Sequence, residues 1–527
     1  MEHLSDPLSI PRRSRRQLLR LVVMGAAGGG SAALLAACGA SVATSVGTTA
    51  ASTGSAASHA VTATTSAAPS ASTASATVAA QTAAATSASS KAASAPAASA
   101  AAPAGKPVEI RAHMVKKIDV SDWIQTGLDQ NIGGWKTQYP NVTVTLETVP
   151  GWTDAYYPKI FALASADELG DAVWYPPRHG DDFAWATQFN LVRPLDALAA
   201  TAKYDRSQFF PAGIAGNSIN GKWYWFPYIA EPVVPVIAYN KTKAQLLGLQ
   251  EPTDDMTFED WSAWAKSGTR SGTSPTYGFY HGDWGNDPFG NGPLLRQFGV
   301  EPVSADGTKA TFLSSGGNGF SDALQWRSDL VNTVKAEPPP NLPGGINQDK
   351  LFQGQQLLAA PVWPFRIQNY PTMFKDFEMG FVLTPTVKKG DKRRSMLNQH
   401  VFGVTMASKN PGVAFDFLAW ICGKDMELEG LLQGPKGPSV RVDFWQDPRI
   451  YQKYPTYAKL KPIMENIEPD YLVANYRGGD FDSAFSKEVG LLLSGKTGVD
   501  TAATQIQQLC QAVLSQSAPG VPAQPKK

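Results

Sequence analysis

The stretch NGKWYWFPYIAEPVVPVIAYNK, residues 220–241, says most about the fold of this chain. Trp223 and Trp225 alternate along a strand-like run, which predicts that at least one of them is structural. Pro232 and Pro235 stiffen the segment that leads into the second apolar run, at the end of the stretch.

Upstream of this stretch, short strands alternate with amphipathic helices. The run VEIRAHM at 108–114 alternates like a strand, and the run VTVTL at 142–146 is β-branched, so both predict strands. Residues 123–139 predict a helix that ends at Pro140, and residues 171–174 begin another strand. Strands that alternate with helices imply βαβ units and a mostly parallel sheet.

The first 38 residues have the pattern of a secretory leader. Basic residues at 12–20 precede an apolar run rich in Gly and Ala, 21–37, and then Cys38. This is the order of a charged region, an apolar region and a small-residue cleavage site. The alternative is an uncleaved transmembrane anchor, for which a run of about 17 residues is weak.

Two motifs refine the interpretation of the leader. SRRQLLR at 14–20 resembles a twin-arginine export signal, although arginines also cluster in the leaders of general secretion. LAACG at 35–39 resembles a bacterial lipobox, in which Cys38 would be lipidated and become the mature N-terminus. The predicted signal peptide is therefore 1–38.

Residues 39–105 form a segment of nearly uniform composition. It consists almost entirely of Ala, Ser and Thr, with Lys91 as its only formal charge. Such a segment cannot bury enough apolar surface to offset its ordering entropy, so it predicts a disordered tether. The folded domain is then expected at 106–520, followed by a disordered tail at 521–527.

Composition and motifs exclude several classes of function. The formal net charge is +1, and most of the basic excess lies in the leader, so the remainder lacks the charge expected for nucleic-acid binding. The chain has no GxSxG elbow and no Walker motif, and its six His are scattered, which predicts neither a metal site nor a cofactor. A glycosidase remains open, because its carboxylates meet only in space.

Ordered landmarks across residues 106–515 resemble the extracellular solute-binding proteins of ABC importers, the branch that carries sugars and oligosaccharides. They are, in chain order, YPNVTV at 139–144, LASA at 163–166, GDAV at 170–173, NLVRPLD at 190–196, NGKWYWFP at 220–227, AYNK at 238–241, TFEDW at 257–261, FQGQ at 352–355, SKNP at 408–411 and LSGK at 493–496. No single motif is specific; their order carries the resemblance.

The resemblance implies an α/β, two-lobed periplasmic-binding-protein-like (type II) fold with a hinge and an interlobe cleft. Ligand contacts from both lobes would favour closure of the hinge. The strands that cross between the lobes are expected near Tyr239-Asn240, near 380–385 and near 402–407.

A sugar presents an apolar face and a rim of hydroxyl groups, so its binder needs aromatic platforms and a few polar groups. The resemblance implies Trp363 as a stacking residue and Glu231 as an acidic contact. It also implies that the loop with Tyr175 and Arg178 supplies an aromatic and a charged contact. Trp284, in a Gly-rich loop, could cover the other face of the ligand.

Three more candidates, Trp123, Arg477 and Asp480, occupy segments that could face the cleft. Each aromatic candidate has an alternative, because an isolated Trp is more often a core residue than a ligand platform. Of the three cysteines, Cys422 and Cys510 allow either a disulfide or two separately buried thiols.

The sequence predicts a non-catalytic, monomeric receptor held outside the cytoplasmic membrane by the lipid on Cys38. It would capture a small solute, a sugar or oligosaccharide, and deliver it to an ABC transporter permease. Two alternatives remain: an exported carbohydrate-active lyase or hydrolase, and a surface adhesion or sensory lipoprotein on the same fold.

Overall fold

The computed structural model describes residues 106–176, 182–340, 342, 345–434 and 436–518. The expectations for the signal peptide, the tether and the tail, and those for Cys38 and Arg178, lie outside these ranges. Within these ranges, none of the helices combines the length and the apolar character that a membrane span requires.

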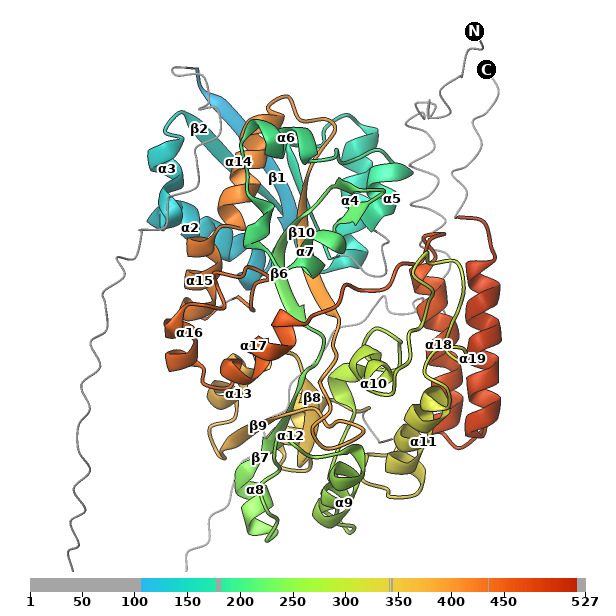
Figure 1. The fold of residues 1–527 in the computed structure, drawn as a ribbon. Coiled ribbons are helices and arrows are strands. Elements are labelled where there is room, and N and C mark those ends of the chain that lie inside the picture. The colour runs from blue at the N-terminus through green and yellow to red at the C-terminus, as the bar shows by residue number, and fades with distance from the viewer. Residues whose placement is uncertain (1–105, 177–181, 341, 343–344, 435, 519–527) are drawn as a thin grey trace, which may run out of the picture. The chain divides into compact units, whose positions relative to one another are not determined.

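A five-stranded sheet lies in the upper part of Figure 1. Its strands are, in spatial order, β2 (Val142–Val149), β1 (Val108–Val115), β3 (Ala172–Tyr175), β10 (Leu397–Val404) and β6 (Phe226–Pro232). β1 runs parallel to β2 and β3, whereas β10 is antiparallel to both of its neighbours. The expectation of a mostly parallel sheet is therefore right for the first three strands and wrong for β10.

A second sheet lies in the lower part of Figure 1 and has three antiparallel strands. Its order is β8 (Ala359–Val362), β7 (Val236–Asn240) and β9 (Met379–Leu383). All five residues of the central strand β7 are buried. A small hairpin of β4 (Ser218–Ile219) and β5 (Lys222–Trp223) accompanies the first sheet.

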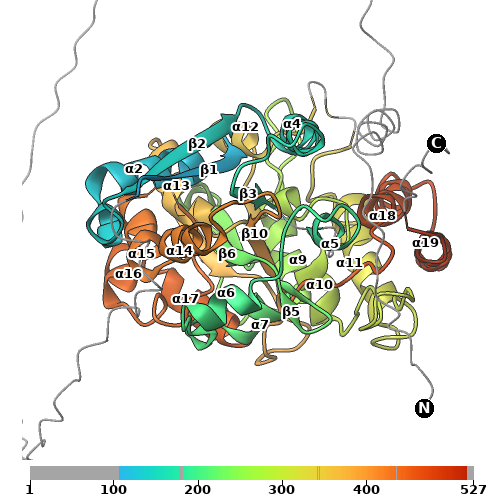
Figure 2. The same cartoon turned by 90° about the horizontal axis from the view of Figure 1, so that it is seen from above.

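Helices cover both sheets. Those packed with the first sheet are α2 (Trp123–Gln130), α3 (Trp135–Gln138), α4 (Thr153–Ser165), α5 (Asp182–Thr187), α6 (Asp196–Thr201), α7 (Pro211–Ala215), α14 (Pro411–Ile421), α15 (Lys424–Gln433), α16 (Pro448–Lys453) and α17 (Tyr457–Glu465). Those packed with the second sheet are α8 (Lys241–Leu246), α9 (Phe258–Gly268), α10 (Gly292–Gln297), α11 (Gly319–Asn332), α12 (Gln348–Gln353), α13 (Phe365–Met373), α18 (Gly478–Leu493) and α19 (Val499–Leu514). Short turns of other helix types are η1 (Ile118–Asp122), η2 (Ile132–Gly134), η3 (Arg206–Gln208) and η4 (Gly282–Trp284). Figure 2 shows α18 and α19 side by side at one edge.

We call residues 106–232 and 397–465 the first lobe and residues 236–383 and 470–518 the second lobe. Each lobe has its own apolar core, and a third apolar cluster contains residues of both. Trp223 and Trp225 are both fully buried in the first core. Cys422 lies in the first core and Cys510 in the second, and both are free thiols, so the alternative of two separately buried thiols holds.

Local sequence signals explain where several elements begin. Thr257 and Asp260 form a capping box at the start of α9, in which each side chain accepts a hydrogen bond from the other residue's backbone N–H. The single helix expected over 123–139 is wrong, because the chain breaks between α2 and α3. Gly133 and Gly134 have φ of 65° and 75° there, which suits residues that lack a Cβ.

Three segments carry the chain between the lobes. They are 233–235, 384–396 and 466–469. The first follows Pro232 and precedes the expected position at Tyr239-Asn240, which lies at the far end of β7. The second segment, 384–396, shares only its first two residues with the crossing expected at 380–385. The expected crossing at 402–407 is wrong, because Phe402 lies within β10 in the first sheet.

Hydrogen bonds join these three segments side by side. The Val233 amide donates to the Met396 carbonyl at 2.9 Å, and the Leu397 amide donates to the Glu468 carbonyl at 2.9 Å. The Glu468 amide donates in turn to the Ser395 carbonyl at 3.2 Å. The hinge is therefore a narrow, hydrogen-bonded strip.

A cluster of four charges, which we call the hinge charge cluster, lies beside this strip. Arg394 donates to both carboxylate oxygens of Glu468 at 2.9 Å, and also to Glu301 at 2.7 Å. Arg296, only 4% exposed, lies 3.3 Å from Glu301 and 3.4 Å from Glu468. Since Arg296 and Glu301 belong to the second lobe, the cluster fastens two crossing segments to that lobe.

Candidate functional site

The strand register identifies the edges of the two sheets that lie next to the hinge. Glu231 pairs with Asn398 beside the last residue of β6, where the chain leaves the first sheet. In the second sheet, Val362 and Leu383 both pair with Val236, the first residue after the crossing. Loops that leave these strand ends lie where α/β proteins bind their ligands.

An exposed aromatic side chain lies at this edge of the first lobe. Trp152 follows β2, and its side chain is 38% exposed. The Lys117 ammonium, in the loop after β1, lies 4.2 Å from the centroid of the Trp152 ring, within the range of a cation–π interaction. This contact orients the ring and leaves part of it open to solvent.

Two further rings support Trp152. Trp174 and His400 contact it, with centroids at 5.3 and 5.7 Å, and also contact each other at 5.5 Å. Burial lowers the pKa of His400 to about 3, and the positive charges of Lys117 and Lys436 act in the same direction. His400 is therefore a neutral ring that packs under the exposed tryptophan.

Buried charged groups of the first lobe hold this edge of its sheet in place. Lys436 and Glu427 form a fully buried ion pair, and the Lys436 ammonium donates to the Tyr228 carbonyl at 2.6 Å. The Tyr228 hydroxyl donates to the Asp119 carbonyl at 2.8 Å, and the Asp119 carboxylate lies 3.7 Å from Lys117. The backbone beside Lys117 is thus tied to the interior of the lobe.

Glu231 lies deep at the same edge and is buried. Gly437, which follows Lys436 in the chain, packs against Glu231. A Cβ added at Gly437 would lie 3.4 Å from Glu231 Oε2. Burial raises the pKa of Tyr457, and the negative charge of Glu231 adds to that rise. The carboxylate therefore lies between β6 and the segments that carry Lys436 and Tyr457.

Trp363 occupies the corresponding edge of the second lobe. It follows β8 directly and precedes α13, and it is half-buried. Its ring stacks on the buried ring of Phe289, with centroids 6.2 Å apart and planes at 28°. One face of Trp363 is supported in this way, as a stacking platform requires.

Buried polar groups brace the Gly-rich loop that ends in Phe289. The His281 imidazole pairs with the buried Glu337 carboxylate. Arg327, also buried, donates to the Gly285 carbonyl at 3.3 Å and to the Asn286 side chain at 3.2 Å. Burial lowers the pKa of His281, the Arg327 charge lowers it further, and Glu337 opposes both effects.

Three other aromatic candidates are buried inside the lobes. Trp284 is 1% exposed and contacts Phe279 and Trp326 in the second core. Trp123 lies in the first core, where its indole N–H donates to the Met426 carbonyl at 3.1 Å. These placements favour the alternative of core packing.

Tyr175 is buried as well, at the end of β3. Its ring stacks on Tyr157, with centroids 5.2 Å apart, and meets Trp185 edge-on at 4.6 Å. It lies at the hinge-facing end of the strand, and most of its surface is covered.

Arg477 and Asp480 lie together at the start of α18. The Arg477 guanidinium donates to the Asp480 carboxylate at 2.8 Å and to the Ser517 carbonyl at 2.9 Å. The first contact stays within the start of α18, and the second joins the start of α18 to the segment after α19. The structure does not bring this pair together with Trp363 or Glu231 through any hydrogen bond or ion pair between described residues.

Sequence reasoning missed Trp152 and Lys117. Both follow a predicted strand, as the loop after Trp174 does, and Pro150 and Gly151 mark a turn directly before Trp152. Applying the strand-end rule to every strand, and not only to β3, would have found them.

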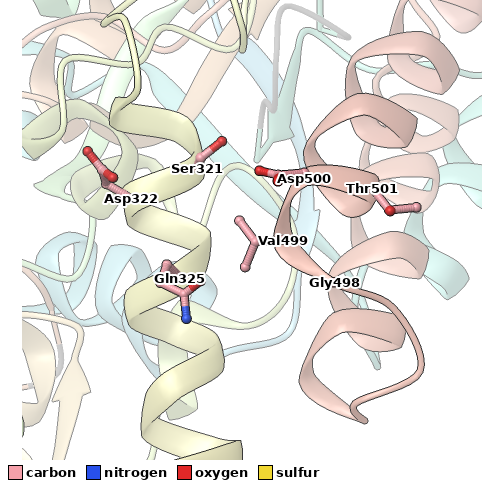
Figure 3. Close-up of a pocket in the computed structure, with 7 residues that line it drawn as sticks. All are labelled: Ser321, Asp322, Gln325, Gly498, Val499, Asp500 and Thr501. Carbon is pink, nitrogen blue, oxygen red and sulfur yellow. The ribbon is translucent and has the colours of Figure 1, made fainter.

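A separate groove lies between α11 and the start of α19 (Figure 3). It encloses about 380 Å³, and its lining residues are Ser321, Asp322, Gln325, Gly498, Val499, Asp500 and Thr501. Its lining contains no aromatic ring, and the groove lies away from the sheet edges at the hinge. Within the described ranges, no three His, Cys, Asp or Glu side chains gather as a metal ion would require.

Solved structures share this fold. An ABC substrate-binding protein of Listeria monocytogenes, in complex with cycloalternan, matches with TM-score 0.62 and 16% identity over 78% of this chain and 99% of that one. The GacH receptor of Streptomyces glaucescens, solved with acarbose, matches with TM-score 0.61 and 18% identity over 78% and 100%. A cyclic α-maltosyl-1,6-maltose-binding protein of Arthrobacter globiformis matches with TM-score 0.61 and 20% identity over 77% and 99%.

These likenesses define the class: a two-lobed α/β solute-binding fold with a hinge and an interlobe cleft, as the sequence predicted. Residues 133–456 match the family of bacterial extracellular solute-binding proteins, and because this is more than half of the chain, the protein belongs to that family. Membership makes it an exported protein that acts outside the cytoplasm.

Proposed function

We propose that this protein is a receptor that captures a sugar or oligosaccharide in the cleft between its lobes and delivers it, unchanged, to an ABC transporter permease. The proteins of similar structure bind cycloalternan, acarbose or a cyclic maltosyl-maltose, according to their names. These are all carbohydrates, which supports a carbohydrate for this chain as well.

One observation carries the proposal: an aromatic face lies at the hinge-facing edge of each lobe. Trp152 stands open on the first lobe, and Trp363 is supported by Phe289 on the second. Glu231 lies next to the last residue of β6, at the point where the chain leaves the first sheet for the hinge. Flat aromatic faces with a nearby acid match the apolar C–H face and the hydroxyl rim of a sugar.

Among the remaining candidates, Tyr175 and Arg178 stay proposals for the rim of the site, because they flank the end of β3. Trp123 and Trp284 pack inside the cores, and Arg477 and Asp480 contact each other at the start of α18, so these four are not included in the proposed site. We further propose that the chain is monomeric and needs no cofactor or metal for binding.

The test is isothermal titration calorimetry of residues 106–527 against maltose, maltotriose, cyclic glucans and monosaccharides, with product analysis by chromatography. We expect saturable binding of at least one sugar and no change in that sugar after prolonged incubation. Cleavage of a glycosidic bond would instead support the alternative of an exported lyase or hydrolase. Absence of binding across the panel would refute a carbohydrate receptor.

Single substitutions locate the site within the same test. Trp363→Ala and Trp152→Ala should each weaken binding by about 1–3 kcal/mol, as expected for the loss of an aromatic contact in a binding site. Trp420→Ala is the matched control, since Trp420 is a partly buried tryptophan that packs against α3 in the first lobe. If Trp363→Ala and Trp152→Ala bind the sugar as tightly as Trp420→Ala and wild type do, neither tryptophan belongs to the site.

A further inference from the structure

A hydrogen-bonded contact joins the two lobes outside the hinge. The Gln368 side chain, on α13 of the second lobe, donates to the Tyr457 hydroxyl at 2.8 Å and to the Lys436 carbonyl at 3.3 Å. The Tyr457 hydroxyl, on α17 of the first lobe, donates to the Pro364 carbonyl at 3.4 Å. Figure 1 shows α13 and α17 close together where the lobes meet.

This contact is buried. Gln368 is 9% exposed and Tyr457 is fully buried, with its ring stacked near Trp445 at 6.0 Å. Apolar residues of both lobes surround it, among them Ile367 from α13 and Leu460 from α17. Each of these polar atoms needs its partner, because a buried donor or acceptor that loses its hydrogen bond without gaining water destabilises the folded state.

The same contact touches the segments that carry the proposed ligand contacts. Pro364 directly follows Trp363, so Tyr457 holds the turn on which that tryptophan stands. Lys436 directly precedes Gly437, the residue that packs against the Glu231 carboxylate. The three hydrogen bonds therefore connect the platform of one lobe with the acid of the other.

We propose that Gln368 and Tyr457 form a latch that closes when the lobes close and positions Trp363 and Glu231 on the same solute. The inference rests on the proposed function, since it names residues that complete the same site without contacting the solute. When the lobes separate, water replaces each partner of the latch; when they close, the partners must meet. The latch thus favours the closed state and slows release.

The experiment compares Gln368→Met and Tyr457→Phe with a matched control inside one lobe. Gln348→Met is that control: Gln348 is also buried, and its side chain donates to the Tyr370 hydroxyl at 3.0 Å, with both residues in the second lobe. Solute dissociation is followed by stopped-flow tryptophan fluorescence, the affinity by calorimetry, and the radius of gyration by small-angle X-ray scattering with and without sugar.

We expect both latch variants to bind the sugar about tenfold more weakly and to release it faster, with a smaller contraction on binding. Gln348→Met should lose thermal stability but keep the wild-type dissociation rate. A purely structural role for Gln368 would give the same pattern as Gln348→Met, and that result would overturn the latch.

The two proposals fail in distinguishable ways. If the wild-type protein binds no sugar of the panel, the proposed function is refuted. The latch is then judged by scattering alone: a larger radius of gyration in Gln368→Met and Tyr457→Phe than in wild type and Gln348→Met supports it. Equal radii would refute it.

Discussion

Trp152 differs from the other tryptophans in how the fold uses it. Eleven of the 14 tryptophans are buried, among them Trp174, which contacts Trp152. Such side chains build the two cores, since each removes a large apolar area from water. Trp152 rests its ring edge on that buried layer and on His400, and its exposed part remains available to a ligand.

The depressed pKa of His400 makes a prediction about acid stability. Burial lowers this pKa from 6.5 to about 3, so below about pH 6.5 the unfolded chain takes up a proton that the folded chain does not. The contribution of His400 to the free energy of unfolding is therefore lost as the pH falls from 6.5 towards 3. Between pH 6.5 and 4.5 this loss amounts to up to about 2 kcal/mol. Urea unfolding at several pH values measures this slope.

His400→Gln should flatten that dependence without abolishing it. Burial also lowers the pKa values of His113 and His281, and these residues act in the same direction. Burial raises the pKa of Glu427, so this residue makes the folded state more stable as the pH falls. Its contribution is the same in wild type and in His400→Gln. Parallel stability–pH curves for wild type and His400→Gln would contradict the assignment of a neutral His400.

At the scale of elements, the hinge charge cluster sets where the crossing segments can bend. Arg394 and Glu468 lie on two of these segments and are held by Arg296 and Glu301 of the second lobe. The held stretch moves with the second lobe, so bending is confined to the residues between the cluster and the first sheet.

Glu468→Gln should lower the free energy of unfolding by about 1–3 kcal/mol. The substitution removes one of the two carboxylates that pair with Arg296 and Arg394, so that only Glu301 remains as their partner in the cluster. Because Arg296 is buried, the loss of a charged partner is costly. Urea unfolding measures the change, which should shrink at high salt because the other partners are partly exposed.

Glu465→Gln is the control for this prediction. It removes the same charge three residues earlier, at the exposed end of α17, and should change stability by less than about 0.5 kcal/mol. Equal effects of the two substitutions would show that the cluster has no special role.

Local elements could be predicted from the sequence, and long-range partners could not. The alternating run at 108–114 and the β-branched run at 142–146 form β1 and β2, because alternation and strand propensity are local signals. The break between α2 and α3 was missed although Gly133 and Gly134 mark it. β10 could not be placed, because its insertion between β3 and β6 depends on residues far apart in the chain.

The sequence predicted those candidate site residues whose place follows from the order of landmarks along the chain. Glu231 and Trp363 lie at the ends of strands, and the family landmarks around them indicated as much. Whether a tryptophan at a loop position faces the core or the solvent depends on its neighbours in space. For this reason Trp284, a candidate from the sequence, lies in the core, whereas Trp152, which the sequence analysis did not single out, is exposed. The partners Gln368 and Tyr457 belong to different lobes, so no local pattern connects them.

At the scale of the whole molecule, the three cysteines allow a test of the proposed anchor. Cys38→Ser should move the protein from the membrane fraction to the soluble fraction and abolish incorporation of labelled fatty acid, because the lipid would be attached to that sulfur. Cys510→Ser is the control, since Cys510 is a buried free thiol of the second core. Membrane association that survives Cys38→Ser would point to an uncleaved anchor.

The position of β10 has a consequence for how the chain acquires its structure during synthesis. This strand reaches the first sheet only after the whole second sheet has been made, and it then separates β3 from β6. A nascent chain that ends before residue 404 leaves β3 and β6 with open edges, which invite pairing with other chains. Productive folding therefore has to wait for the late strand, and a chaperone that shields these edges would raise the yield more than one that acts on the finished protein.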